Sequence, residues 1–337
     1  MKHPLIGAPW PGGESLVAVI WFVFAIAGYF AAGGSVFLVL LERKAQRERN
    51  QPLLSFLQDW SRFFLLLTVI LGGGSAVGGW IAEGVIQPSF TLASSGFLLW
   101  VWGMVWVLAM VQLAAALLYH SGWGVAAPVH HRAIGWIFSV AAWGGLFTLT
   151  GIMARLCVPG DTGGTCAISP DFFGESFSPL LLENAGLALG LGGLFSLVGG
   201  AGAEIRLRST LVRYASGFVV AGFALWLIGL GWHVMILPEA ARRVLLGPVS
   251  PPTLLFTGSL ALSVILIASV LTGPMSRPEG CTASFALLLL LMGLVVAFAG
   301  MHIRTTARSH AHSTVMSAYN GRYEAARAVL PPVRESS

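Results

Sequence analysis

Two of the eight histidines, His233 and His302, lie in apolar segments where an imidazole could serve as a metal ligand. His233 is found in GLGWHVMILPE and His302 in AFAGMHIR, each about one helical turn before an apolar segment ends. Neutral imidazole ligates haem iron without placing a charge in lipid, so the pair could hold one b-type haem. Alternatively, both side chains lie at the membrane interface and bind water, lipid headgroups or a partner.

Three further histidines surround a short polar turn. They are His120, in LLYHSGWG, and His130 and His131, in APVHHRAIGW. Polar groups at the ends of apolar segments are usually solvated at the membrane surface. We therefore expect these three imidazoles to be solvated rather than to bind a metal.

The sequence lacks the common catalytic signatures, and we assign no catalytic residue. CxxCH, Walker A, HExxH and CxxC do not occur, which excludes covalent haem attachment, P-loop nucleotide hydrolysis and common zinc-protease chemistry. Glu83 and Glu183 stand at the ends of apolar segments, where a carboxylate reaches the interface easily. No row of acidic groups therefore marks an ion or proton pathway.

The segments that must position these residues are typical of a membrane protein. Of the 337 residues, 56% are hydrophobic and 10% charged, whereas about a quarter are charged in soluble domains. Crossing a hydrocarbon core of about 30 Å takes roughly 20 helical residues. We predict an all-α, polytopic bundle over residues 1–303 and an extramembrane tail over 304–337. The eight predicted spans are 15–41, 61–83, 96–121, 132–156, 179–201, 213–237, 252–274 and 282–303.

Glycine-rich stretches in the second and fifth spans, LGGGSAVGGW and GLALGLGGLFSLVGG, predict close contact between helices.

Basic residues predict the orientation of the bundle. Lys and Arg cluster in the loops after spans 1, 3, 5 and 7, and such loops face the cytoplasm. We therefore expect both termini outside, in the inner membrane of a bacterium with a periplasm. The net charge of +5 reflects this topology and does not indicate nucleic-acid binding. The basic residues on the predicted inner side are Arg43, Lys44, Arg47, Arg49, Arg132, Arg206, Arg208 and Arg277, with Arg62 and Arg213 at adjoining span starts.

Three segments resemble the first four helices of subunit I of cytochrome bd ubiquinol oxidases. They are GGSVFLVLLERKA, SRFFLLLTVILGGGSAVGGW and SGWGVAAPVHHRAIGWIFSVAAW. The resemblance covers about residues 15–160, and the later helices only by spacing and by the tail IRTTARSHAHSTVMSAYNG. It is closer to the shorter bd-like subunits of bacterial respiratory gene clusters, some of which continue into a periplasmic c-type cytochrome.

The same resemblance shows which family residues this chain lacks. In place of the first-helix histidine that binds a high-spin haem, FVFAIAGYFAAGG offers Phe24 and Tyr29. Two third-helix carboxylates correspond to Met104 and Gln112, and the fifth-helix histidine of the low-spin haem to Asn184. The quinol-binding loop is represented only by PEAARRVLLGPVSPP. We therefore expect the oxygen-reducing site to be lost.

Two classes of function remain. The first is a membrane subunit of a bacterial respiratory electron-transfer complex, which either links the quinone pool to periplasmic cytochromes through one b-type haem or acts as a haem-free scaffold. The second is a secondary transporter or channel. The expected partners are the lipid bilayer, other membrane subunits, a periplasmic c-type cytochrome and, in the electron-carrying form, quinone. The basic, tyrosine-containing tail suits docking on another subunit, and a solvated disordered tail is the alternative.

The three cysteines yield the first testable prediction. Cys157 and Cys166 flank VPGDTGGT on the predicted outer side, whereas Cys281 falls near the inner face. An oxidising compartment favours a disulfide between the first two, the alternative being an incidental pair of thiols. We expect mass spectrometry of non-reduced peptides from native membranes to find Cys157 linked to Cys166. Recovery of both as free thiols would refute the pairing.

Overall fold

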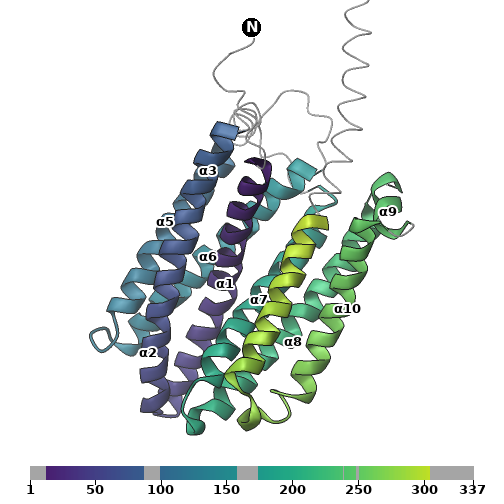
Figure 1. The fold of residues 1–337 in the computed structure, drawn as a ribbon. Helices are drawn as coiled ribbons and strands as arrows, with labels where there is room; N and C mark the ends of the chain where they lie inside the picture. The colour runs from purple at the N-terminus through teal and green to yellow at the C-terminus, as the bar shows by residue number, and fades with distance from the viewer. Residues whose placement is uncertain (1–12, 87–98, 158–173, 238, 248–249, 304–337) are drawn as a thin grey trace, which may run out of the picture.

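The fold is a bundle of membrane-spanning helices. The computed structural model describes residues 13–86, 99–157, 174–237, 239–247 and 250–303. Over these ranges the chain forms helices and no strands, and eight of the helices are long and apolar enough to cross a membrane. Because eight crossings return the chain to the side where it began, Gly13 and Ile303 lie at the same end of the bundle (Figure 1). The predicted fold class is confirmed.

The first half of the bundle holds four spans, of which the second consists of three consecutive helical segments. The last span, Ala283–Ile303, follows a short 3-10 turn. The elements are α1 (Gly13–Arg47), α2 (Gln51–Leu66), the π-helix η1 (Leu67–Gly73), α3 (Gly74–Ile86), α5 (Leu99–Ser121), α6 (Pro128–Cys157), α7 (Phe177–Ala201), α8 (Ile205–Ile236), α9 (Glu239–Leu246), α10 (Pro251–Thr272) and η3 (Pro278–Gly280).

Several helices continue beyond the predicted spans. Helix α1 runs on to Arg47, and α2 begins at Gln51, well before the predicted start at residue 61. The start of α2 is fixed by Asn50, whose side chain accepts a hydrogen bond of 3.1 Å from the backbone N–H of Leu53. The predicted boundaries were wrong here because the hydrophobic pattern locates the membrane-embedded part of a helix, and a capped helix can extend into water.

Helix α7 is the central helix of the bundle. In its apolar window 67% of the residues are buried, compared with 17% in the span Gln51–Ile86 and in α5. Glycines bring its backbone against both neighbours: a Cβ on Gly222 of α8 would lie 2.1 Å from the backbone N of Gly190, and one on Gly33 of α1 would lie 1.8 Å from the carbonyl oxygen of Ala188. The close packing predicted for the fifth span is therefore confirmed.

The glycines of the second span behave differently. A Cβ added to Gly73, Gly74 or Gly78 would meet no atom within 4 Å, while Gly79 faces Trp21 of α1. Among the described residues, most glycines of LGGGSAVGGW therefore do not bring helices into close contact, and the prediction was wrong for them.

The basic segments gather at one end of the bundle, which we call the inner end. Arg132, at the start of α6, donates a hydrogen bond of 2.6 Å to Gln46 at the end of α1. Lys44, Arg213 and Arg277 line a single cavity. The loops after spans 1, 3, 5 and 7 therefore lie together, as the charge pattern predicted.

The backbone contact between α7 and α8 predicts a sharp difference between two glycines of α8. Gly222→Ala should lower the free energy of unfolding by about 1–3 kcal/mol, because the added methyl group meets backbone that cannot move aside. Gly217→Ala is the matched control, since its Cβ would meet nothing within 4 Å. That variant should be neutral or stabilised by up to about 1 kcal/mol, because alanine favours helix. Thermal unfolding in detergent checks both, and equal melting temperatures would contradict the packing.

Candidate functional site

A buried carboxylate–imidazole pair lies at the inner end of the bundle. Glu42 of α1 is fully buried, and its Oε1 lies 2.8 Å from Nδ1 of His131 on α6, a side chain only 3% exposed. Tyr119 of α5 donates its hydroxyl hydrogen to Glu42 Oε2 at 2.8 Å. His131 Nε2 lies 2.9 Å from the carbonyl oxygen of Tyr119, which can only accept a hydrogen bond. Nε2 therefore keeps its hydrogen, and a single proton is shared between His131 Nδ1 and Glu42 Oε1.

Polar side chains connect this pair to the inner surface. Gln46 donates a hydrogen bond of 2.6 Å to Glu42 Oε1 and accepts one from Arg132, and both side chains are partly exposed. The rings of Tyr119 and Trp123 lie on His131, each with its centroid 4.4 Å from that of the imidazole. The pair is thus covered by aromatic rings and reaches water through Gln46 and Arg132.

The histidines of this region divide in a way that the sequence prediction missed. His130 is exposed, as predicted, and His120 is partly exposed, with its Nδ1 3.0 Å from Ser61 Oγ. The prediction that His131 is solvated was wrong. One residue along a helix turns the side chain by about 100°, so His131 enters the bundle where His130 faces out.

Glu42 was also missed, although the sequence contains a signal for it. It follows the apolar run SVFLVLL and precedes the charged residues RKAQRER, so it looks like a surface residue. Yet it lies four residues after Leu38 and beside Leu41 and Ala45, which are buried at helical spacing. Its position on that face predicts burial.

A second buried pair lies at the opposite, outer end. Glu183 of α7 is fully buried, and its Oε1 lies 2.7 Å from Nδ1 of His233 on α8, a side chain 4% exposed. The prediction that Glu183 reaches the interface was wrong, because it lies on the central helix. Glu83, near the end of α3, is partly exposed, in keeping with its predicted place at a span end.

The two histidines predicted as haem ligands differ in their surroundings. A Cβ on Gly300 would lie 3.6 Å from Trp226 Nε1, so the last span and α8 are neighbours. His233 has the setting of an axial ligand: Glu183 holds Nδ1, and Nε2 has no hydrogen-bond partner in the part of the chain that the structure describes. His302 is exposed on the surface of the bundle and stacks on Phe298. The surroundings of His233 therefore suit a haem ligand, whereas those of His302 do not. The described residues do not enclose a site with two histidine ligands. The haem stays a prediction.

The positions where the bd-type resemblance implies haem ligands hold a chain of hydrogen bonds. Tyr29 of α1 donates to Asn184 Oδ1 at 2.7 Å, and Asn184 Nδ2 donates to Thr150 Oγ1 of α6 at 2.8 Å. These bonds join α1, α7 and α6. Phe24 is partly buried against Trp21, with ring centroids 5.4 Å apart.

The two positions that correspond to family carboxylates lie away from the buried interior. Met104 is 46% exposed on α5, and Gln112 is partly exposed. The structure therefore brings Tyr29 and Asn184 together and leaves Met104 at the surface.

A haem does not fit beside the middle of α7. Between Gly186 and Gly193 the backbone of α7 touches α8, and Gly192 touches Gly33 of α1. A flat macrocycle needs a gap between helices, and backbone contact leaves none along this stretch. The residues present do not fit a haem between α1, α7 and α8 at this depth.

The cysteine predictions are tested only in part. Cys166 and the side chain of Cys157 lie outside the described residues, as does the tail over residues 304–337. Cys281 is buried and free, between α10 and the last span at the inner end, as predicted. Burial raises the pKa of its thiol, which keeps it protonated and unreactive.

Comparison with solved structures finds a similar fold in the bd oxidase from Geobacillus thermodenitrificans. The TM-score is 0.73 at 12% sequence identity, over 88% of this chain and 86% of that one. No family model and no curated protein sequence matches the chain. At this identity the similarity shows a bd-oxidase-like fold, which agrees with the resemblance found in the sequence.

The inner pair predicts a large difference between two glutamates of α1. Glu42→Ala removes the acceptor for His131, Tyr119 and Gln46, and breaking a buried pair should lower the free energy of unfolding by about 3–5 kcal/mol. Glu48→Ala is the control, because Glu48 is exposed and its ion pair with Lys44 is 3.8 Å long. We expect that change to cost less than about 1 kcal/mol. Denaturation in detergent gives both values. A Glu42→Ala chain as stable as the control would show that the Glu42–His131 pair does not contribute to the stability of the fold.

Proposed function

We propose that this chain is a membrane subunit of a bacterial respiratory electron-transfer complex, built on the bd-oxidase fold and lacking an oxygen-reducing site. The observation that carries the proposal is the shared fold, which covers most of both chains. The proposed location is the bacterial inner membrane. The proposed partners are other membrane subunits and a periplasmic c-type cytochrome.

The loss of the oxygen-reducing site is supported by what occupies its expected place. Tyr29 and Asn184 hydrogen-bond to each other where the resemblance implies histidines. The phenol of Tyr29 donates its hydrogen bond to the amide oxygen of Asn184, which supports a structural role for both side chains. About one helical turn further along, Gly33 brings the backbone of α1 against Ala188 of α7. We therefore favour the scaffold form of the subunit, in which the bundle holds neighbouring subunits and its interior is filled by side chains.

One observation favours the electron-carrying form as a second candidate. His233 is buried near the outer end, and Glu183 lies within hydrogen-bond distance of its Nδ1, as carboxylates hold the far ring nitrogen of metal-ligating imidazoles. A b-type haem there would supply one-electron transfer on the side of the periplasmic cytochrome and would extend the role of the subunit to linking the quinone pool with that cytochrome. His302 would have to leave Phe298 to become the second ligand.

The transporter or channel alternative has less support. Transport sites are expected near the bilayer midplane, where buried charges or broken helices mark them. Among the described residues, the buried carboxylates Glu42 and Glu183 are each paired with a histidine and lie toward opposite ends of the bundle.

Visible absorbance separates the forms of this proposal. The purified chain should show no carbon-monoxide-sensitive band of a high-spin haem and should consume no oxygen with quinol. A high-spin band from this chain alone, or quinol-dependent oxygen uptake, would overturn the loss of the oxygen site.

The same spectra test the two histidines. In the scaffold form the dithionite-reduced chain has no b-type band. If that band is present, His233→Ala and His302→Ala should each abolish it while leaving the subunit in its complex. Because His233→Ala removes one partner of the buried Glu183, thermal unfolding checks that this variant folds. A band that survives both single changes would exclude this ligand pair, and His120→Ala serves as the control because its imidazole hydrogen-bonds Ser61 at the other end of the bundle.

A further inference from the structure

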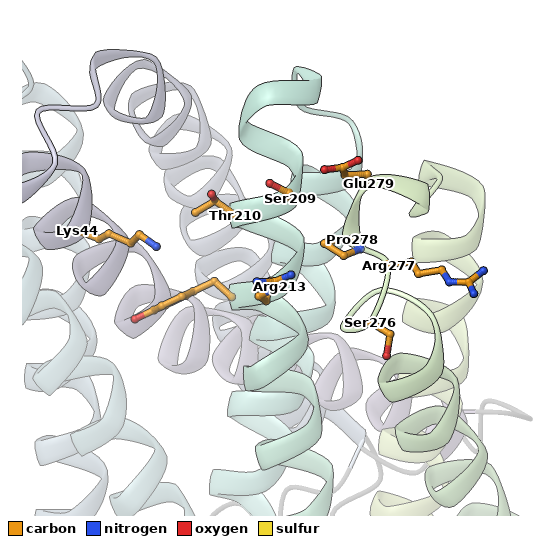
Figure 2. Close-up of a pocket in the computed structure, with 9 residues that line it drawn as sticks. Lys44, Ser209, Thr210, Arg213, Ser276, Arg277, Pro278 and Glu279 are labelled. Carbon is orange, nitrogen blue, oxygen red and sulfur yellow. The ribbon is translucent and has the colours of Figure 1, made fainter.

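A cavity of about 560 Å³ opens at the inner end of the bundle, between α1, α8 and the loop before the last span. Figure 2 shows the side chain of Lys44 directed from α1 toward α8, where Ser209, Thr210 and Arg213 line the opposite wall. A second cavity, of about 310 Å³, shares Lys44 and Tyr214 with the first. The two cavities adjoin at Lys44 and Tyr214, and we refer to them together as the hollow.

The hollow carries an excess of positive charge. The first cavity is lined by Lys44, Arg213 and Arg277 with Glu279, and the second adds two arginines and Glu48. Within the part of the chain that the structure describes, Arg213 and Arg277 make no ion pair, and Lys44 has only the long contact to Glu48. Unneutralised cations that converge on one hollow favour a bound anion.

Hydroxyl groups complete a set of donors for that anion. Ser209 and Thr210 are partly buried on the first turns of α8, and their hydroxyls have no hydrogen-bond partner among the described residues. An ammonium, a guanidinium and two hydroxyls together match the oxygen atoms of a phosphate group. Arg277 extends from the loop away from Lys44 and lies at the rim (Figure 2).

The wall below the cations is apolar. Leu40 and Tyr214 line the second cavity, and both side chains are partly exposed. Phe37 is fully buried behind them, with its ring centroid 6.0 Å from that of Tyr214 and 5.7 Å from that of Phe218. Leu40 lies about one helical turn deeper in the membrane than Lys44. A ligand that combines a phosphate with hydrocarbon chains would match both the cationic rim and the apolar surface below it.

We propose that this hollow binds the phosphodiester headgroup of an anionic phospholipid in the inner leaflet. Lys44 and Arg213 provide the charge, Ser209 and Thr210 donate hydrogen bonds, and the acyl chains lie against Leu40 and Tyr214. Basic pockets between membrane helices on the cytoplasmic side bind such headgroups. The site is independent of any haem and of the proposed respiratory role.

Native mass spectrometry of the full chain in detergent tests this site. The probes are phosphatidylglycerol and phosphatidylcholine with identical acyl chains, and inorganic phosphate alone. The test variant is Lys44→Gln/Arg213→Gln. The matched control is Arg62→Gln/Arg206→Gln, which removes two exposed arginines of the same end that do not line the hollow. Thermal unfolding without added lipid confirms that both variants fold.

We expect phosphatidylglycerol to bind the wild-type chain in preference to phosphatidylcholine. The test variant should bind it roughly thirtyfold more weakly, since each surface cation contributes roughly fivefold to sixfold, and the control should bind as the wild type does. Equal binding by the two variants, or equal binding of the two lipids, would overturn the site. Inorganic phosphate that binds alone and displaces the lipid would assign the hollow to a free phosphate instead.

Discussion

Contact between helix backbones along α7 determines how the rest of this bundle is arranged. Glycines at Gly190 and Gly222 let α7 and α8 touch, and Gly33 and Gly192 do the same for α1. In lipid there is no hydrophobic force between helices, so van der Waals contact of this kind must supply much of the association. The outer helices α2, α3 and α5 then attach to α1 and α6, and their remaining surface is free for lipid or for other subunits.

The same tight interior favours pairing of buried ionisable groups. Among the described residues Glu42 and Glu183 are the buried carboxylates, and each meets an imidazole on a neighbouring helix, Glu42 with His131 and Glu183 with His233. An isolated buried charge would cost several kcal/mol, but a pair that shares one proton can become neutral by moving that proton between the two groups. The bonds from Tyr29 to Asn184 and from Asn184 to Thr150 pair three further polar side chains beside Glu183, on the outer part of α7.

Much of this architecture could be predicted from the sequence, because spanning a bilayer demands a long apolar run. All eight spans were predicted. The charge pattern also predicted that the basic loops lie at the same end of the bundle. The end of α1 and the start of α2 were not predicted, because the length of an apolar run reports only the part of a helix that lies in lipid. Both helices continue into water. The inner pair was missed for another reason, because Glu42 and His131 stand beside exposed charged or polar residues. For Glu42 the buried face could have been found from the spacing of Leu38, Leu41 and Ala45. For His131, whose neighbour His130 is exposed, only the rotation of the helix decides which side chain enters the bundle. That rotation depends on contacts between helices far apart in the chain.

The short connection between α7 and α8 bears on how the chain is made. Only residues 202–204 separate these helices, so they can enter the bilayer during synthesis as one hairpin. Glu183 then meets His233 on the very next helix, and its charge need never face lipid alone. The partners of Glu42 are synthesised later, because Tyr119 and His131 belong to the third and fourth spans. Glu42 lies toward the inner end of α1 and can remain hydrated until these residues are inserted. The order of the helices along the chain thus lets each carboxylate stay paired or hydrated while the bundle is assembled.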